Sequence, residues 1–430
     1  MLNTESMDRR HFITAVSGCA LAEFCTARAA AQPTGRWTAV QKLIDGYVAH
    51  ERFAGVVAAL SYGGKGVTYP AAGRIALDSP VRFDENSLCR ISSMTKPVTG
   101  IAAMTLVEDG RMTLDQAVAD VLPELRSMRV AVDIENGLAS RPAVNTMTMR
   151  HLLTHTSGFS YWIPASGEST LPKEYRKRGI TPGNVGPRLN RPGYGPQAKN
   201  LVEMIERVAE LPLAYEPGTV WHYSIGLDVM GLVIERVTGK SFDVFLRERL
   251  FDPLNMDSTS FQVTPKNAAR LTTNYNETPD GLRPTDIGAS SVWLKPSTLL
   301  AGGAGLVSSA RDFARFGEML LGDGKFGRVR VIKPETARRS RSNLLPASVI
   351  YSGGGFGAGG RVFLPGGDSR AAPPGSFGWS GAAGTLWFID PARRGNMVFM
   401  GQHMPPRTYP FPYHYDMAAA IEEDLKAGRY

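Results

Sequence analysis

The order of strand-like and helical segments predicts an α+β fold, in which an antiparallel sheet is flanked by helices and joined to a mostly helical inserted domain. Strand patterns occupy residues 36–120 and return in residues 300–430, whereas residues 121–299 combine helical periodicity with long loops. Strands from both ends of the chain are therefore expected to meet in one sheet domain. We expect the binding site between this sheet and the inserted domain.

The N-terminal part of the sheet domain is predicted to contain a helix, a hairpin and a second helix. Apolar side chains recur at helical spacing over residues 37–48. Two β-rich runs, residues 56–62 and 66–73, are divided by a pair of glycines, which is typical of a hairpin. The second helix is expected to open near Ser93 and to stop at Gly110.

The inserted domain and the C-terminal part also show apolar residues at helical spacing and at the alternating spacing of strands. Helices are predicted over residues 201–211 and 227–237, and strands over residues 385–389 and 397–400, which flank a turn and are expected to pair antiparallel. Residues 163–198 are rich in proline and glycine. We expect a long structureless loop there, and such a loop usually covers a functional site.

Composition and charge narrow the classes of protein. The chain has 430 residues, of which 43% are hydrophobic and 20% charged, and these values are typical of a globular protein. It contains no apolar run of about 18 residues, so no transmembrane helix is predicted. The net charge is +8, but the lysines and arginines are scattered and form no nucleic-acid-reading motif, so we expect no nucleic-acid partner.

Residues 1–31 have the pattern of an export signal. Arg9 and Arg10 precede a short apolar stretch, and small residues lead up to Ala31. A paired arginine is typical of the twin-arginine route, which predicts a periplasmic or secreted protein. Two alternatives stay open, namely a lipoprotein anchored through Cys19 and an ordinary N-terminal extension of a cytoplasmic protein.

The first candidate for chemistry is the pair Ser93 and Lys96. Residues three apart on a helix share a face, so the amine of Lys96 is expected beside the hydroxyl of Ser93. A serine is a weak nucleophile until a base takes its proton, and an amine held neutral by burial or by another cation can do so. Pro97 is tolerated only near a helix start, which places Ser93 at the positive N-terminal end.

Two further segments complete the candidate site. Tyr223 lies just before a predicted helix, where its phenol can reach a cleft and act as a general base. The Gly-rich segment 377–384 leads into a strand, and its small residues let a substrate approach backbone N–H groups that stabilise an oxyanion. Ser380 nearly matches the nucleophile elbow G-x-S-x-G, but no strand-to-helix turn is predicted there. A packed aromatic ring and a tight turn are the plainer alternatives for these two segments.

Together, the three segments resemble the serine β-lactamase and penicillin-binding-protein superfamily, in particular its class C-like branch and the family VIII carboxylesterases. The resemblance runs from Trp37 to the C-terminus. Further segments typical of that superfamily follow in the expected order, at residues 149–158, 216–218, 250–256 and 302–306. The resemblance implies a β-lactamase-like fold and one catalytic unit.

The resemblance also implies roles for individual residues. It implies that Ser93 is the nucleophile, that Lys96 activates it, and that Tyr223 relays its proton to the leaving group. It places the backbone N–H groups of Ser93 and Ala382 in the oxyanion hole. Either Lys96 or Tyr223 can be the base in acylation, and the pair is expected to titrate as a unit. No cofactor is expected.

Two departures from the family pattern concern the substrate. β-Lactamases and D-Ala-D-Ala peptidases normally carry Lys or His at the start of the third motif, where this chain has Trp379. The indole offers an apolar wall in place of a cation that would hold a substrate carboxylate. Ile225 replaces a frequent Asn in the second motif and cannot hydrogen-bond a substrate amide. Trp379, Ser380 and Gly381 are therefore expected to bind an ester.

These residues predict a carboxylesterase that acts on small-molecule esters with short to medium acyl groups. The open alternatives are a β-lactamase or D-Ala-D-Ala carboxypeptidase, an acyltransferase that uses the same acyl-enzyme, and a catalytically silent sensor domain. No metal is expected, because His151 and His155 are four residues apart without a glutamate after His151 or a third ligand. None of these patterns predicts the oligomeric state.

Overall fold

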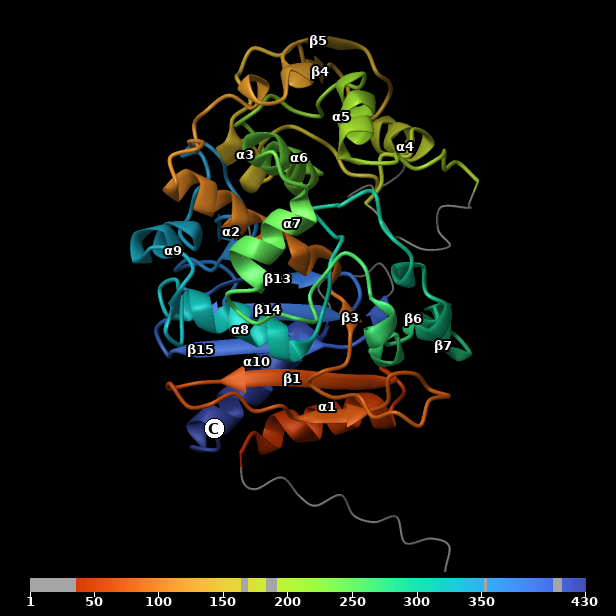
Figure 1. The fold of residues 1–430 in the computed structure, drawn as a ribbon, viewed down its shortest axis with the longest axis vertical. Coiled ribbons are helices and arrows are strands. Elements are labelled where there is room, and N and C mark those ends of the chain that lie inside the picture. Colours follow the sequence, from red (N-terminus) through yellow and green to blue (C-terminus); the bar gives the residue numbers. More distant parts are fainter. Residues whose placement is uncertain (1–35, 164–168, 183–191, 352–353, 405–411) are drawn as a thin grey trace, which may run out of the picture. The chain divides into compact units, whose positions relative to one another are not determined.

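A seven-stranded antiparallel sheet forms the centre of the computed structural model and joins strands from both ends of the chain (Figure 1). Its order is β11-β12-β13-β14-β15-β1-β2. The strands are β1 (Gly55–Ser61), β2 (Ala71–Gly73), β11 (Gly355–Phe356), β12 (Arg361–Val362), β13 (Phe377–Gly381), β14 (Thr385–Asp390) and β15 (Gly395–Met400). Every residue of β1, β14 and β15 is buried, because both faces of the sheet are covered.

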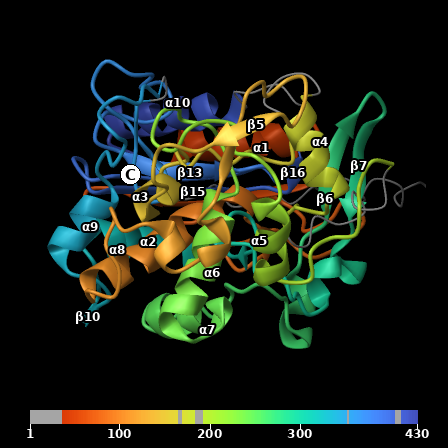
Figure 2. The ribbon, with the colours of Figure 1, turned by 90° about the horizontal axis from the view of Figure 1, so that it is seen from above.

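Helices cover both faces of this sheet, and several come from the middle of the chain. The helices are α1 (Thr38–Ala49), α2 (Thr95–Glu108), α3 (Met149–Leu153), α4 (Thr170–Lys177), α5 (Leu201–Ala209), α6 (Gly226–Thr238), α7 (Phe242–Leu246), α8 (Ala310–Leu321), α9 (Pro334–Ser340) and α10 (Pro412–Lys426). Helices α2 and α6 lie against each other (Figures 1 and 2).

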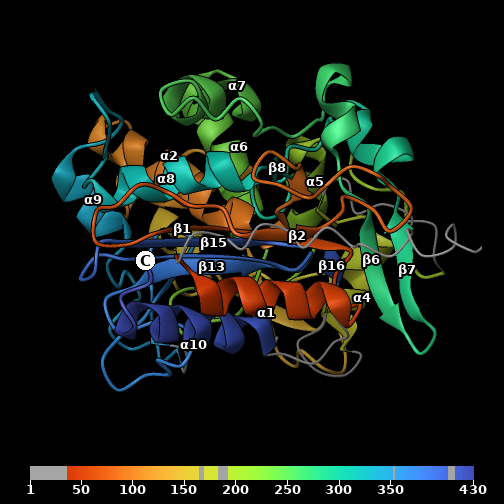
Figure 3. The same ribbon diagram turned by 90° about the horizontal axis from the view of Figure 1, so that it is seen from below.

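Alternate residues of each strand contribute to two separate apolar cores, one on each face of the sheet. On one face, α1 and α10 lie side by side over Ala58 and Phe399, which are paired across β1 and β15 (Figure 3). On the other face, α8 packs over Trp387, whose indole contacts the rings of Phe313 and Phe316. The sheet is therefore the middle of three layers.

Several short strands pair outside the main sheet. β3 (Cys89–Arg90) leads toward Ser93 and pairs with β8 (Val307–Ser308) outside the main sheet. The other short strands pair as β4 (Arg129–Ala131) with β5 (Ser140–Pro142), β6 (Asn274–Thr278) with β7 (Gly281–Asp286) and β16 (His403–Met404), and β9 (Lys325–Phe326) with β10 (Val329–Arg330).

The structure describes most of the chain after the predicted export signal. The described residues are 36–163, 169–182, 192–351, 354–404 and 412–430. Residues 1–31, with Cys19, lie outside them. In the described part, no helix combines the length and the apolar character that crossing a membrane requires.

The α+β class and the antiparallel sheet are confirmed. The predicted strand pair 385–389 and 397–400 is observed as β14 and β15, in antiparallel register. Strands from both ends of the chain share the sheet, as the order of patterns predicts. The division into residues 36–120, 121–299 and 300–430 stays a prediction.

The structureless loop predicted for residues 163–198 is wrong for residues 170–177, where the chain forms α4, while residues 164–168 and 183–191 lie outside the described part. Leu171 and Tyr175, one turn apart, are both buried. Pro172 lies in the first turn, where a helix needs no N–H donor. The proline and glycine content of the flanking residues hid this two-turn amphipathic pattern.

The predicted hairpin is also shorter than expected. Its second run, residues 66–73, is reduced to β2 and one isolated bridge between Leu60 and Thr68. Pro70 accepts a hydrogen bond from Ala58 but has no N–H of its own to donate, so the ladder is interrupted there.

Candidate active site

Ser93 lies in a short 3-10 turn, Ser92–Met94, between β3 and α2. Ser92 has a φ of 45°, in the left-handed region that few residues other than glycine adopt, and it redirects the chain sharply after β3. Helix α2 therefore begins at Thr95, slightly later than the opening predicted near Ser93. The Ser93 side chain is half-buried and so remains within reach of a substrate.

Lys96 is fully buried on the first turn of α2. Its Nζ donates to Ser93 Oγ at 3.2 Å and to the carbonyl oxygen of Gly303 at 2.6 Å. It also lies 4.6 Å from the centre of the Tyr223 ring and 5.7 Å from that of Tyr161. A buried amine needs hydrogen-bond partners, and these contacts hold Lys96 Nζ at the serine.

Tyr223 approaches the same serine from the loop that precedes α6. Its hydroxyl donates to Ser93 Oγ at 2.7 Å. One face of its ring stacks on Trp379, with centroids 6.1 Å apart and planes 17° apart, and the ring also packs 4.6 Å from the imidazole of His155. Because two rigid aromatic side chains contact the ring, the phenol is held over Ser93.

His155 supports Tyr223 and is fully buried. Its Nδ1 is hydrogen-bonded to Ser224 Oγ at 3.0 Å, and its carbonyl accepts from the His222 amide at 2.8 Å. Burial lowers the pKa of His155 well below its usual range, and the Lys96 charge acts in the same direction, so the imidazole is neutral. His151 instead caps α3, and the described residues contain no group of three or more His, Cys, Asp or Glu side chains placed to hold a metal ion.

The C-terminal end of β13 lies against the turn that carries Ser93 and against the Tyr223 ring. Trp379 and Ser380 are half-buried, and Gly381 is buried against the turn that carries Ser93. A Cβ on Gly381 would lie 2.2 Å from the carbonyl oxygen of Ile91, so only glycine permits this close approach. Ala382 follows at the exposed end of the strand. Its amide and that of Ser93 stay the predicted oxyanion donors.

The structure brings the three predicted polar residues into direct contact and adds others that sequence reasoning missed. The Tyr161 ring meets that of Tyr223 edge-on at 5.1 Å, and the Phe356 ring meets that of Trp379 at 5.3 Å. Gly303 supplies the carbonyl that binds the lysine. Gly303 lies within the family segment 302–306 and Tyr161 lies just after the segment 149–158, so both could have been noticed from the sequence. No sequence pattern indicates Phe356.

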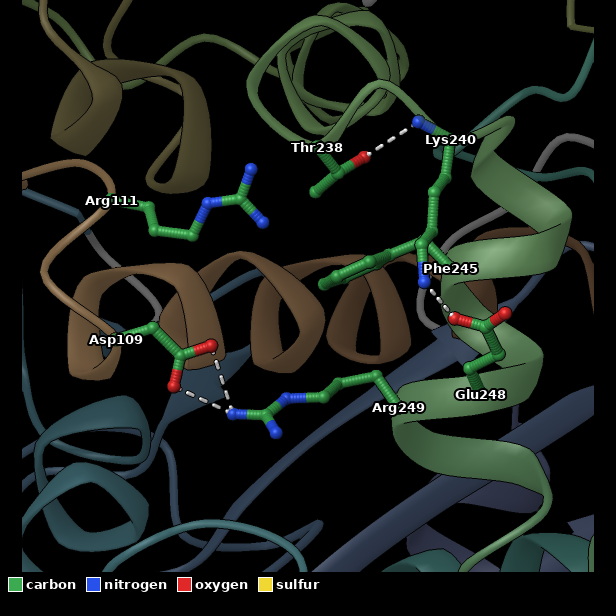
Figure 4. Close-up of a pocket in the computed structure, with 7 residues that line it drawn as sticks. All are labelled: Asp109, Arg111, Thr238, Lys240, Phe245, Glu248 and Arg249. Atoms are coloured by element: carbon green, nitrogen blue, oxygen red, sulfur yellow. Dashed lines mark hydrogen bonds and ion pairs between the residues drawn. The ribbon is translucent and has the colours of Figure 1, made fainter.

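A surface cavity of about 230 Å³ lies well away from this site (Figure 4). It begins just past the C-terminal end of α2, whose 14 residues span about 20 Å from the Ser93 turn. Its charged groups bind one another, as in the 2.8 Å ion pair of Arg249 with Asp109. The lining residues are Asp109, Arg111, Thr238, Lys240, Phe245, Glu248 and Arg249. None of the residues predicted to form the site lines this cavity.

A three-layer α+β fold with serine, buried lysine and tyrosine in contact defines the β-lactamase-fold class of serine hydrolases and acyltransferases. The chain belongs to the beta-lactamase family, whose model matches residues 40–420. That match covers both walls of the site and nearly all of the described layers.

Known proteins similar to this chain include esterases. It is 30% identical over 367 residues to esterase EstB of Burkholderia gladioli, covering 81% of this chain and 86% of EstB. It is 32% identical over 333 residues to the lovastatin esterase of Penicillium rubens, covering 72% and 78% of the two chains. The solved structure of EstCE1, a hydrolase with promiscuous acyltransferase activity, matches with a TM-score of 0.71 and 24% identity over 89% of this chain and 97% of EstCE1.

Proposed function

We propose that this protein is a carboxylesterase that works through an acyl-enzyme at Ser93. The observation that carries the proposal is that Ser93 Oγ lies within hydrogen-bond distance of both Lys96 Nζ, at 3.2 Å, and the Tyr223 hydroxyl, at 2.7 Å. A serine contacted by two groups able to take its proton is activated as a nucleophile. Burial of Lys96 keeps competing water away from that proton transfer.

In the proposed cycle, Ser93 Oγ attacks the ester carbonyl carbon, and its proton passes to the Lys96–Tyr223 pair. The carbonyl oxygen takes up the negative charge, which the backbone N–H groups of Ser93 and Ala382 stabilise. The bond to the alcohol oxygen breaks, and Tyr223 returns the proton to the leaving alkoxide. A water molecule then loses a proton to the same pair, attacks the acyl-enzyme and releases the acid, which restores Ser93.

The proposed substrate is an uncharged small-molecule ester. Trp379 is half-buried beside the serine, stacked on Tyr223 and in edge contact with Phe356, so this wall is apolar and aromatic. Such a wall favours an acyl or alcohol group without charge. The esterases named among the relatives support this substrate class.

Acyl transfer is the second candidate, favoured by a relative named as an acyltransferase, calJ of Penicillium decumbens, which is 28% identical over 355 residues. In that case an alcohol replaces water in the second step and leaves with the acyl group. The first step at Ser93 is the same for both reactions.

Mass spectrometry of the intact protein, after incubation with a panel of p-nitrophenyl esters and β-lactams, tests the proposal. We expect an added acyl mass and ester turnover with the wild-type chain, and neither with Ser93→Ala. The proposal fails if no ester acylates the protein, or if Ser93→Ala keeps full turnover. Faster turnover of nitrocefin than of any ester would assign a β-lactamase, and an acylated product formed on adding an alcohol would assign a transferase.

A further inference from the structure

Asp228 is a buried carboxylate that the proposed cycle does not use. It lies in the first turn of α6 and is 1% exposed. Its Oδ1 accepts a hydrogen bond from the amide of Gly303 at 2.8 Å. Among the described residues, no group hydrogen-bonds its other oxygen, Oδ2. An incompletely bonded buried carboxylate costs free energy, and its place in the first turn of α6, where a negative charge is favourable, offsets part of that cost.

The residue that Asp228 binds is also the residue that binds Lys96. The carbonyl of Gly303 accepts from Lys96 Nζ at 2.6 Å, while Thr99 Oγ1 donates to the carbonyl of Gly302 at 2.7 Å. A Cβ on Gly303 would lie 2.6 Å from Asp228 Oδ2, so a larger residue would displace the carboxylate. The Gly302-Gly303 segment is thus held between α2 and α6, with the Asp228 carboxylate at the Gly303 amide and Lys96 Nζ at the Gly303 carbonyl.

Few titratable groups lie around the Gly302-Gly303 segment besides Asp228 and Lys96. Burial raises the pKa of Asp228, whereas the positive charge of Lys96 acts to lower it. The other titratable groups facing the lysine are Tyr161, Tyr223 and His155. Burial, with contributions from Tyr223 and Asp228, raises the pKa of Tyr161 well above its usual range, and His155 is held neutral. Neither of these two groups supplies a negative charge to balance a protonated Lys96.

We propose that Asp228 is a positioning residue, which balances the charge of Lys96 through Gly303 and so keeps the amine aligned on Ser93 whenever it holds the serine proton. This inference rests on the proposed acyl-enzyme cycle. Asp228 touches neither the substrate nor the reacting oxygen, and acts through the Gly303 peptide. It accounts for a carboxylate that is buried, incompletely bonded and adjacent to a lysine.

A change in pH profile separates this role from a purely structural one. Removing a buried negative charge makes every proton on the Lys96–Tyr223 pair easier to lose, whichever group is the base. We therefore expect Asp228→Asn, which keeps the shape and the Gly303 hydrogen bond, to move the profile to lower pH by about one unit. The alignment of Lys96 also suffers, so we expect kcat to fall about tenfold with little change in KM.

The experiment measures the rate at which a fluorophosphonate labels Ser93 across the pH range, together with ester kcat and KM. The matched control is Thr99→Val, which loosens the same glycine segment without removing a charge, and it should leave the position of the profile unchanged. Asp228→Glu should retain the wild-type position. Asp228→Ser, smaller and uncharged, gives the same readout if the asparagine variant does not fold.

Each outcome decides the proposal. A profile that stays in place in Asp228→Asn, or that moves equally in Thr99→Val or Asp228→Glu, overturns the role of Asp228 while leaving the esterase intact. A wild-type protein that fails to label at Ser93 overturns the acyl-enzyme and this inference together. A shift confined to the uncharged variants of Asp228 establishes it.

Discussion

Two fully buried aspartates, Asp228 near Ser93 and Asp424 under α1, are bonded in opposite ways. Asp424, on α10, accepts hydrogen bonds from the amides of Ala39 and Val40 at the start of α1, and from Thr38 and Arg429. Among the described residues, Asp228 Oδ1 accepts a hydrogen bond from the Gly303 amide, and no group hydrogen-bonds its Oδ2. Both carboxylates are at most 1% exposed.

From this difference we infer that the residues that stabilise the fold are separate from those that serve the proposed chemistry. On the α1–α10 side, the buried polar group is fully satisfied and fixes a helix terminus, where a negative charge is favourable. Near Ser93, the buried Asp228 carboxylate has one oxygen that no described group hydrogen-bonds, and the Gly302-Gly303 segment holds the carboxylate in place. Substitutions near Ser93 should therefore change activity more than stability, and substitutions under α1 should do the reverse.

The largest expected effect is that of Tyr223→Phe. It removes the hydroxyl that donates to Ser93 Oγ at 2.7 Å but keeps the ring between Trp379 and His155. Losing a general acid–base group lowers kcat by about 10²–10⁴-fold, whereas the free energy of unfolding should change by less than about 1 kcal/mol. Steady-state hydrolysis of a p-nitrophenyl ester and urea unfolding give the two values.

The same chemical change on the other side of the sheet is the control. Tyr47→Phe removes a hydroxyl that donates to Asp416 at 2.6 Å, between α1 and α10. It should lower stability and leave kcat unchanged. A Tyr223→Phe variant with activity within tenfold of the wild type would contradict the division.

The next effect is on stability and comes from Phe399→Ala. Phe399 is fully buried under α1 and α10, where its ring stacks on Tyr413 at 5.1 Å and meets Phe53 edge-on at 5.6 Å. Truncating a buried phenylalanine costs about 3–5 kcal/mol. Urea unfolding should show this loss, with kcat per folded molecule unchanged. A clear drop in kcat at full folding would mean that the α1–α10 layer also shapes the site.

The sequence predicts the layers better than the contacts between them. Periodicity locates β14, β15, α5 and α6, because each is long enough for its apolar pattern to be distinct. It does not reveal that Cys89 pairs with Ser308 in a separate two-stranded sheet, since pairing over such a separation depends on the whole fold. Helix α4 was missed because its two turns lie among prolines and glycines.

The site follows the same rule. Helical spacing alone places Lys96 beside Ser93, and the contact is observed. The place of Tyr223 before a predicted helix makes it a candidate, but only the family resemblance links it to a serine 130 positions earlier. His155 and Asp228 were not predicted as part of the site at all. Their contribution arises from tertiary contacts with Tyr223 and Gly303, and neither spacing nor composition carries that information.

A third prediction concerns pH and the α1–α10 layer. Burial, assisted by Arg361, lowers the pKa of His414 from 6.5 to about 4. Between these two pH values His414 is protonated in the unfolded chain but neutral in the folded chain. The free energy of unfolding therefore decreases as the pH falls from 6.5 toward 4. His414 accounts for about 3 kcal/mol of that loss. His414→Gln should lose about that much less than the wild type in urea unfolding across this interval. Equal losses in both proteins would show that His414 does not titrate in this way.

The smallest effect completes the comparison between the two aspartates. Asp424→Ala removes the acceptor for two amides at the start of α1, of which that of Val40 is buried and that of Ala39 partly buried, and this should cost about 2 kcal/mol of unfolding free energy. Glu423→Ala is its control, because that carboxylate binds the same Arg429 but is 68% exposed, and an exposed ion pair contributes less than about 1 kcal/mol. Ester kcat should be unchanged in both variants, in contrast to Asp228→Asn. If Asp424→Ala lowered kcat as much as Asp228→Asn, burial of a carboxylate anywhere in the fold would suffice to explain both, and the distinct role of Asp228 at Lys96 would lose its support.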